Sequence, residues 1–239
     1  MHPVAIFRHS RSEGPGYFAI FLEQHGIPWR LIAIDEDDPV PENSGDFSGL
    51  CFMGGPMSVN DPLPWIEPVC ALIRHAAANA IPVIGHCLGG QLMSKAFGGH
   101  VTANPVMEIG WGEVKAIDNQ EDAHQWLGML AGQSLTAFHW HGETFSLPPG
   151  TRHLLTSNGC ANQAFVLGPH LALQCHLEMT PEMIFAWSRN WDPEAAGLAP
   201  PPATVQSTEA MRQQTTACLP AMRQLADQLY SVWIKGLRP

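Results

Sequence analysis

The chain has 239 residues, of which 12 are Lys or Arg and 22 are Asp or Glu, so its formal net charge is −10. Phosphate binding needs a basic face, and we therefore expect no nucleic-acid partner. Hydrophobic residues make up 45% of the chain and charged residues only 14%, which excludes global disorder and a coiled coil.

Short apolar runs in the first third of the chain are bounded by Gly, Pro or charge and predict buried strands of a parallel sheet. These runs are residues 4–7, 31–34, 50–53 and 83–85. Residues 17–25 and 65–80 between them have helical periodicity. The alternation predicts a layered α/β fold with right-handed crossovers.

The middle of the chain has further strand-like runs with less helix between them, which predicts an antiparallel or mixed extension of the sheet. These runs are residues 114–117, 135–140, 153–156, 163–167 and 171–175. A helix is expected over residues 181–189, and a last helix from about residue 205 toward 235. We expect one domain over residues 1–190, with residues 191–239 as a helical extension packed on it.

The last predicted helix has apolar residues at helical spacing. They are Met211, Cys218, Met222, Leu225, Leu229 and Trp233. This stripe either covers the sheet or forms the seam of a homodimer, and core packing is the favoured alternative.

The N-terminus and the cysteines predict the cellular compartment of the protein. Residues 1–7 lack the features of a signal peptide, and no apolar run approaches the roughly 18 residues of a membrane span. The six cysteines are scattered without metal or redox spacing. We therefore expect a cytoplasmic protein with reduced thiols and no membrane partner.

The first catalytic signature is the stretch GHCLG at residues 85–89, between an apolar strand and a helix. This is the nucleophile-elbow pattern with a thiol in place of a hydroxyl. The helix N-terminus favours the thiolate of Cys87, and the N–H of Leu88 is free to stabilise an oxyanion. Alone, the pattern also fits an ordinary strand-to-helix turn with a buried cysteine.

A second signature ends the strand-like run at residues 171–175. His176 and Glu178 are two residues apart, so on an extended segment they face the same side. Glu178 is then able to orient the imidazole of His176, which a nucleophile needs as its base. Alone, the pair also fits a surface histidine and a helix-capping glutamate; with Cys87 it predicts a Cys-His-Glu triad.

Together, these blocks resemble the class I, triad-type glutamine amidotransferases. The matching stretches are GHCLGGQ at 85–91, QCHLE at 174–178 and GGPMS at 54–58, the last resembling that family's oxyanion-hole loop. Residues 104–105, 108–111 and 140–143 resemble stretches of its stand-alone, GMP-synthase-like members. The resemblance implies a flavodoxin-like three-layer fold, with a mostly parallel central sheet, an antiparallel extension and helices on both faces. It also implies hydrolysis of a γ-glutamyl amide through a thioester.

The resemblance also assigns roles to single residues. Cys87 is implied as nucleophile, His176 as acid/base and Glu178 as its orienter. The oxyanion hole is implied at the backbone N–H groups of Gly55 and Leu88. Substrate-binding positions are implied at Gly54, Gln91, His141 and Gly142.

Three positions depart from the family pattern. Cys175 and Leu177 stand where an aromatic residue and a proline usually flank the histidine, and His86 replaces a small or apolar residue. Cys175 is expected to leave space, and His86 to perturb the thiol. His139 and His141 form a two-histidine pair on a strand, but no third ligand is evident nearby. We therefore expect no metal and no cofactor.

Three functions fit these residues. The first is a glutaminase that releases glutamate and ammonia for a separate synthetase partner, because the chain has neither an adenylating loop nor a P-loop. The second is a stand-alone γ-glutamyl peptidase or hydrolase acting on a small γ-glutamyl compound. The third is a non-catalytic binding or regulatory relative in which Cys87 is a redox or structural residue.

Overall fold

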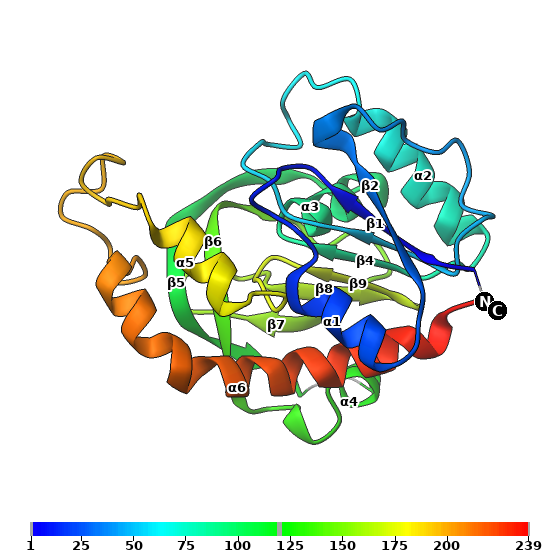
Figure 1. Ribbon diagram of the computed structural model, residues 1–239. Helices are drawn as coiled ribbons and strands as arrows, with labels where there is room; N and C mark the ends of the chain where they lie inside the picture. Colours follow the sequence, from blue (N-terminus) through cyan, green and yellow to red (C-terminus); the bar gives the residue numbers. More distant parts are fainter. Residues whose placement is uncertain (1, 119–120, 239) are drawn as a thin grey trace.

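A mixed β-sheet crosses the centre of the protein in the computed structural model, which describes residues 2–118 and 121–238 (Figure 1). Within those residues the sheet has nine strands, in the order β2-β1-β3-β4-β9-β8-β7-β5-β6. The strands are β1 (Val4–Arg8), β2 (Trp29–Ala33), β3 (Gly49–Phe52), β4 (Val83–His86), β5 (Val101–Ala116), β6 (Ser134–Phe145), β7 (Arg152–Thr156), β8 (Ala164–Leu167) and β9 (His170–Leu173).

One half of the sheet is parallel and the other half antiparallel. Strand β1 pairs in parallel with β2 and β3, β3 with β4, and β4 with β9. The pairs β9–β8, β8–β7, β7–β5 and β5–β6 are antiparallel. The α/β class and the antiparallel extension are therefore confirmed, but the extension is as large as the parallel part.

The size of the extension comes from β5 and β6, which are longer than the sequence predicts. Strand β5 has 16 residues, although only residues 114–117 read as a strand. A register shift between Ala103 and Glu108, around Pro105, breaks the alternation of buried and exposed residues there. The hydrophobic pattern of this part of the chain therefore hides the strand.

Helices cover both faces of the sheet (Figure 1). They are α1 (Gly16–Gln24), α2 (Ile66–Ala78), α3 (Leu88–Ala96), α4 (Glu121–Leu127), α5 (Pro181–Ser188) and α6 (Thr208–Trp233), with 3₁₀ turns at Ile34–Glu36, Gly128–Leu130 and Ile234–Gly236. Val4 and Ile6 of β1 belong to the core under α1 and α6, whereas Ala5 and Phe7 belong to the core under α2 and α3. Both faces of β1 are buried, which explains its continuous apolar run.

The C-terminal helix α6 packs against the sheet and α1. Its predicted apolar stripe is buried there, except Cys218, which is partly exposed. The helix begins later than predicted, because Val205 forms a bridge with Ile109 and Ser207 caps the helix by accepting from the N–H of Ala210. Across the described residues, no helix is long and apolar enough to span a bilayer.

Candidate active site

The predicted site residues meet at the carboxyl ends of neighbouring strands. Cys87 follows β4, His176 follows β9, and Gly55 follows β3. In open α/β sheets this edge is where ligands bind. A cavity of about 420 Å³ opens there, and its lining includes Cys87, His176, Gly55, Gln91 and His141.

Cys87 sits on a strained turn between β4 and α3. Its backbone has φ 49° and ψ −107°, and non-glycine residues rarely adopt a positive φ. A side chain at Gly89 would collide with the backbone carbonyl of Phe52, and one at Gly85 with the backbone of Gly89. The two glycines thus permit the turn that holds Cys87 at the N-terminus of α3, as the elbow pattern predicts.

His176 and Glu178 form a buried pair beside Cys87. Nδ1 of His176 lies 2.6 Å from Oε1 of Glu178, and the two side chains are about 1–2% exposed. The N–H of His176 donates to the carbonyl of Phe138 in β6 over 2.8 Å, which fixes the backbone. The carboxylate therefore holds Nδ1 of the imidazole, and the ring also interacts with Cys87.

The charges of this pair stabilise each other. Burial alone would lower the pKa of His176, but the Glu178 carboxylate and the Cys87 thiolate raise it well above its ordinary value. Burial alone would raise the pKa of Glu178, but the His176 imidazolium holds it at about 2. The favoured state of the pair is an imidazolium beside a carboxylate.

Gln174 extends the site beyond the predicted residues, and it contacts the predicted Gln91. Nε2 of Gln174 lies 3.6 Å from Sγ of Cys87, and Nε2 of Gln91 donates to Oε1 of Gln174 over 3.2 Å. Both side chains are buried. Sequence reasoning missed Gln174 as a site residue, although its position two residues before His176 on an extended segment was the available signal.

The glycine loop after β3 adjoins the nucleophile. An added Cβ on Gly55 would lie 2.6 Å from Cδ2 of Leu88, so the loop and the start of α3 are in contact. Leu88 is the first residue of α3, and its N–H has no intrahelical acceptor. Gly54 does not line the cavity; it lies between the side chains of Glu13 and His176.

The three unusual residues are all buried away from the cavity. His86 is fully buried and its Nε2 lies 2.9 Å from the hydroxyl of Tyr230 in α6. Burial lowers its pKa, so it is neutral. Cys175 and Leu177 belong to the core that also holds α6. None of the three lines the cavity next to Cys87.

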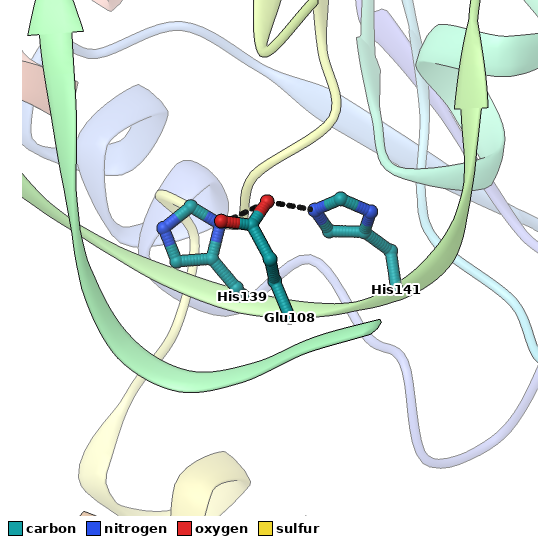
Figure 2. Close-up of side chains that lie close together, drawn as sticks. All are labelled: Glu108, His139 and His141. Carbon is teal, nitrogen blue, oxygen red and sulfur yellow. Dashed lines mark ion pairs between the residues drawn. The ribbon is translucent and has the colours of Figure 1, made fainter. Parts of the chain in front are cut away.

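A second polar cluster lies under the site, on β5 and β6. Figure 2 shows that Glu108 points between the two histidines of the predicted pair, His139 and His141. Glu108 is therefore a candidate third ligand, which the sequence did not reveal. Oε2 of Glu108 lies 3.1 Å from Nε2 of His141 and 4.0 Å from Nδ1 of His139. One carboxylate and two imidazoles are a donor set that suits zinc.

The remaining contacts of the cluster are those of a hydrogen-bonded network. Nε2 of Gln163 donates to Oε2 of Glu108 over 2.7 Å and lies 3.4 Å from a ring nitrogen of each histidine. Ser157 donates to the other carboxylate oxygen over 2.8 Å. The Gln163 amide thus fills the space between the three candidate ligands.

His141 links this network to the cavity. Its Nε2 lies 3.1 Å from Oε2 of Glu108, and its Nδ1 lies 3.0 Å from the backbone carbonyl of Glu143. His141, Gly142 and Glu143 line the cavity, and the Glu143 carboxylate accepts from the hydroxyl of Ser58 over 3.0 Å. The structure therefore brings His141 and Gly142 to the cavity, together with an acidic residue that the sequence analysis passed over.

Comparison with known proteins gives the family. The family model described as "Glutamine amidotransferase class-I" matches residues 22–184. A solved structure of a glutamine amido transferase from Methylobacillus flagellatus is 42% identical, with a TM-score of 0.91, and the alignment covers 100% of this chain and 96% of that one. The chain belongs to the class-I glutamine amidotransferase family, and the predicted resemblance is confirmed.

Curated relatives differ in the activities that their names state. The chain is 30% identical to the glutamine amidotransferase-like protein YfeJ of Salmonella typhimurium over 74% of its own length and 75% of that protein. It is 26% identical to gamma-glutamyl peptidase 5 of Arabidopsis thaliana, over 71% and 70% of the two chains. It is 32% identical to a subunit of the glutamine-hydrolyzing GMP synthase of Sulfurisphaera tokodaii, over 56% and 68%. These similarities support the general glutamine-hydrolysing function of the family. They do not specify the substrate of this chain or a partner protein.

Proposed function

We propose that this chain is a thiol hydrolase of γ-glutamyl amides, with Cys87 as nucleophile, His176 as acid/base and Glu178 as the residue that orients His176. The observation that carries the proposal is the 2.6 Å contact of His176 with Glu178, beside a cysteine on a strained turn at a helix N-terminus. A nucleophile, a base and an orienting group in this order are the arrangement of a covalent hydrolase.

In the proposed reaction, the Cys87 thiolate attacks the γ-carbonyl carbon and a carbon–sulfur bond forms. His176 gives its proton to the amide nitrogen, the carbon–nitrogen bond breaks, and the amine leaves. His176 then takes a proton from water, which attacks the thioester and releases glutamate. The buried Glu178 carboxylate stabilises the imidazolium that the first step requires.

The other roles follow from the places of the residues around the cavity. The N–H groups of Gly55 and Leu88 are proposed to bind the oxyanion, and Gln91 to line the slot for the glutamyl chain. His141 and Gly142, which both line the cavity, are proposed to bind the α-amino and α-carboxylate end of the glutamyl group. Gly54 is proposed to hold the loop close to His176 instead of touching substrate.

The size of the cavity favours the stand-alone hydrolase. A cavity of about 420 Å³ is in the range that binds ligands larger than glutamine. Ammonia as leaving group would leave the outer part of this cavity without a ligand contact. The similarity to gamma-glutamyl peptidase 5 supports the same alternative.

The second candidate is a glutaminase that supplies ammonia to a separate synthetase. The similarity to the GMP synthase component of Sulfurisphaera tokodaii favours it, because that protein is named as one subunit of a glutamine-hydrolyzing synthase. The six unpaired cysteines support a reducing, cytoplasmic location for either enzyme. In both, residues 191–239 are proposed to stabilise the catalytic domain of residues 1–190.

Glutamate release by the isolated protein separates the candidates. The stand-alone hydrolase releases glutamate from γ-glutamyl peptides or γ-glutamyl alkylamides much faster than from glutamine. The reverse preference, or activity that needs an added synthetase, supports the glutaminase. No glutamate release from either substrate, with Cys87 unreactive toward a glutamine-like electrophile, overturns both and leaves the non-catalytic relative.

A further inference from the structure

Three tryptophans form a wall on one side of the cavity. The ring of Trp140 lies 5.7 Å from that of Trp187 and 5.2 Å from that of Trp191, in edge-to-face geometry. Trp187 donates its indole N–H to the carbonyl of Ser12 over 2.7 Å, and Trp191 donates to that of Gln206 over 3.0 Å. These bonds hold two of the three rings in place, so the wall is built in advance of any ligand.

The tryptophan wall lies beside the acid/base residue. The ring of Trp187 packs edge-on against the imidazole of His176, with ring centres 5.0 Å apart. In the proposed reaction His176 protonates the departing amine, so a group attached to that amine meets the wall. The wall is therefore on the leaving-group side of the cavity, where Trp187 adjoins His176.

The cavity also has an acidic lining. It contains the carboxylates of Glu13 and Glu143, and none of the lining residues in the described part of the chain is Lys or Arg. Glu13 lies with the His176 ring against Gly54, and it follows Ser12, the residue that anchors Trp187. Glu13 is thus the acidic group on the leaving-group side.

The two carboxylates are expected to bind different parts of the substrate. A γ-glutamyl substrate has one α-ammonium group, for which Glu143 is the partner next to Gly142 and His141. Glu13 then has no partner in the glutamyl part of the substrate. Tryptophan rings and a nearby carboxylate together are the chemistry that recognises an organic cation.

We propose that the leaving group is an alkylamine with a second, cationic ammonium, held between the tryptophan wall and Glu13, so that the substrate is the γ-glutamyl derivative of a diamine. This inference rests on the proposed function and specifies its substrate class. The amide carbon–nitrogen bond breaks, His176 protonates the departing nitrogen, and water hydrolyses the thioester. The products are glutamate and the free diamine, and Glu13 offsets the repulsion between the distal ammonium and the His176 imidazolium.

A pair of substrates that differ in one group tests the proposal. N-γ-glutamyl-1,5-diaminopentane and N-γ-glutamylhexylamine have equal chain length, but only the first ends in a cation. We expect the wild-type protein to hydrolyse the cationic compound with a kcat/KM about tenfold higher or more. Glu13→Gln brings the ratio of the two kcat/KM values close to one, and Trp191→Leu lowers it. Glu42→Gln, at an exposed position away from the cavity, keeps the wild-type ratio.

A binding experiment separates this inference from the proposed function. Calorimetry with the Cys87→Ala variant measures the affinity for both compounds without turnover. Equal hydrolysis and equal binding of the two compounds, with activity that still depends on Cys87, overturns the inference and leaves the proposed function intact. Glu13-dependent preference for the cationic compound, with no hydrolysis of any γ-glutamyl amide, supports the cation site and overturns the proposed function.

Discussion

The side-chain amide of Gln174 faces the sulfur of Cys87, with Nε2 and Sγ 3.6 Å apart. Gln91 donates to the carbonyl oxygen of the same amide, which orients its N–H₂ group toward the thiol. A donor aimed at sulfur favours the thiolate over the thiol, because only the anion is a strong acceptor. The nucleophile is therefore supported from two directions, by His176 and by a pair of buried amides.

Replacing Gln174 tests this second support. Gln174→Leu removes the donor, and we expect the rate of Cys87 alkylation by iodoacetamide and kcat both to fall about tenfold. The shape-matched Gln174→Glu places a negative charge near the sulfur and gives a larger fall. Gln125→Leu, on the exposed side of α4, is the control. Unchanged alkylation in Gln174→Glu would show that the amide does not act on the thiolate.

Glu178→Gln separates charge from shape at the orienting residue. The amide still reaches His176 but does not stabilise its cation, and we expect kcat to fall by about 10²–10⁴. The pKa of His176 drops with the loss of the carboxylate, so the alkaline limb of the kcat–pH profile moves to lower pH. Glu182→Gln, on the exposed side of α5, leaves both unchanged. A variant with lower kcat but an unmoved pH profile contradicts the orienting role.

The preference for the cationic substrate is expected to increase with pH, because the Glu13 carboxyl loses its proton. Burial raises the pKa of Glu13 to about 7, with His176 opposing the rise and Glu178 adding to it. Below this value the carboxyl is neutral and does not attract the distal ammonium. We expect the ratio of kcat/KM for the cationic and neutral substrates to rise about tenfold from pH 6 to pH 8.

Both substrates use the same triad, so any change in the protonation of His176 or Cys87 alters the two kcat/KM values equally. The ratio of the two values is therefore independent of those groups. Glu13→Gln has no carboxyl to titrate, so its ratio is flat over the same range. A wild-type ratio that is flat, or that falls as the pH rises, assigns the cation preference to another group.

Tyr230→Phe tests the link between β4 and α6. It removes the partner of Nε2 of His86 while keeping the aromatic packing, and both side chains are fully buried. We expect the free energy of unfolding in urea to fall by about 1–3 kcal/mol. Hydrolytic activity below the unfolding transition is unchanged, because His86 faces α6 and not the cavity. Equal stability of the variant and the wild type would contradict this account.

The sequence predicts the parallel half of the fold better than the antiparallel half. Strands β1, β3 and β4 are buried on both faces, so each is a short continuous apolar run that local pattern reveals. Strand β5 mixes buried and exposed residues around a register shift, and its pattern is lost. Helix α4 is short and was not predicted.

In the site, too, residues within short motifs are predictable from the sequence, whereas residues whose partners are distant in the sequence are not. Cys87, His176 and Glu178 each lie in a short motif with a physical signature, so sequence reasoning brings them together. Glu108 was missed because its partners His139 and His141 are on another strand, about 30 residues away. Glu13 was missed because nothing in its own segment shows that it faces His176 across Gly54.

Covalent labelling at Cys87 tests the central claim most directly. A glutamine-like diazoketone alkylates a nucleophilic thiol that binds a glutamyl chain, and intact mass followed by peptide mapping locates the adduct. We predict one adduct per chain, on Cys87, with loss of hydrolysis in step with labelling and no adduct in Cys87→Ala. An adduct on another cysteine, or hydrolysis that survives in Cys87→Ala, would contradict the claim.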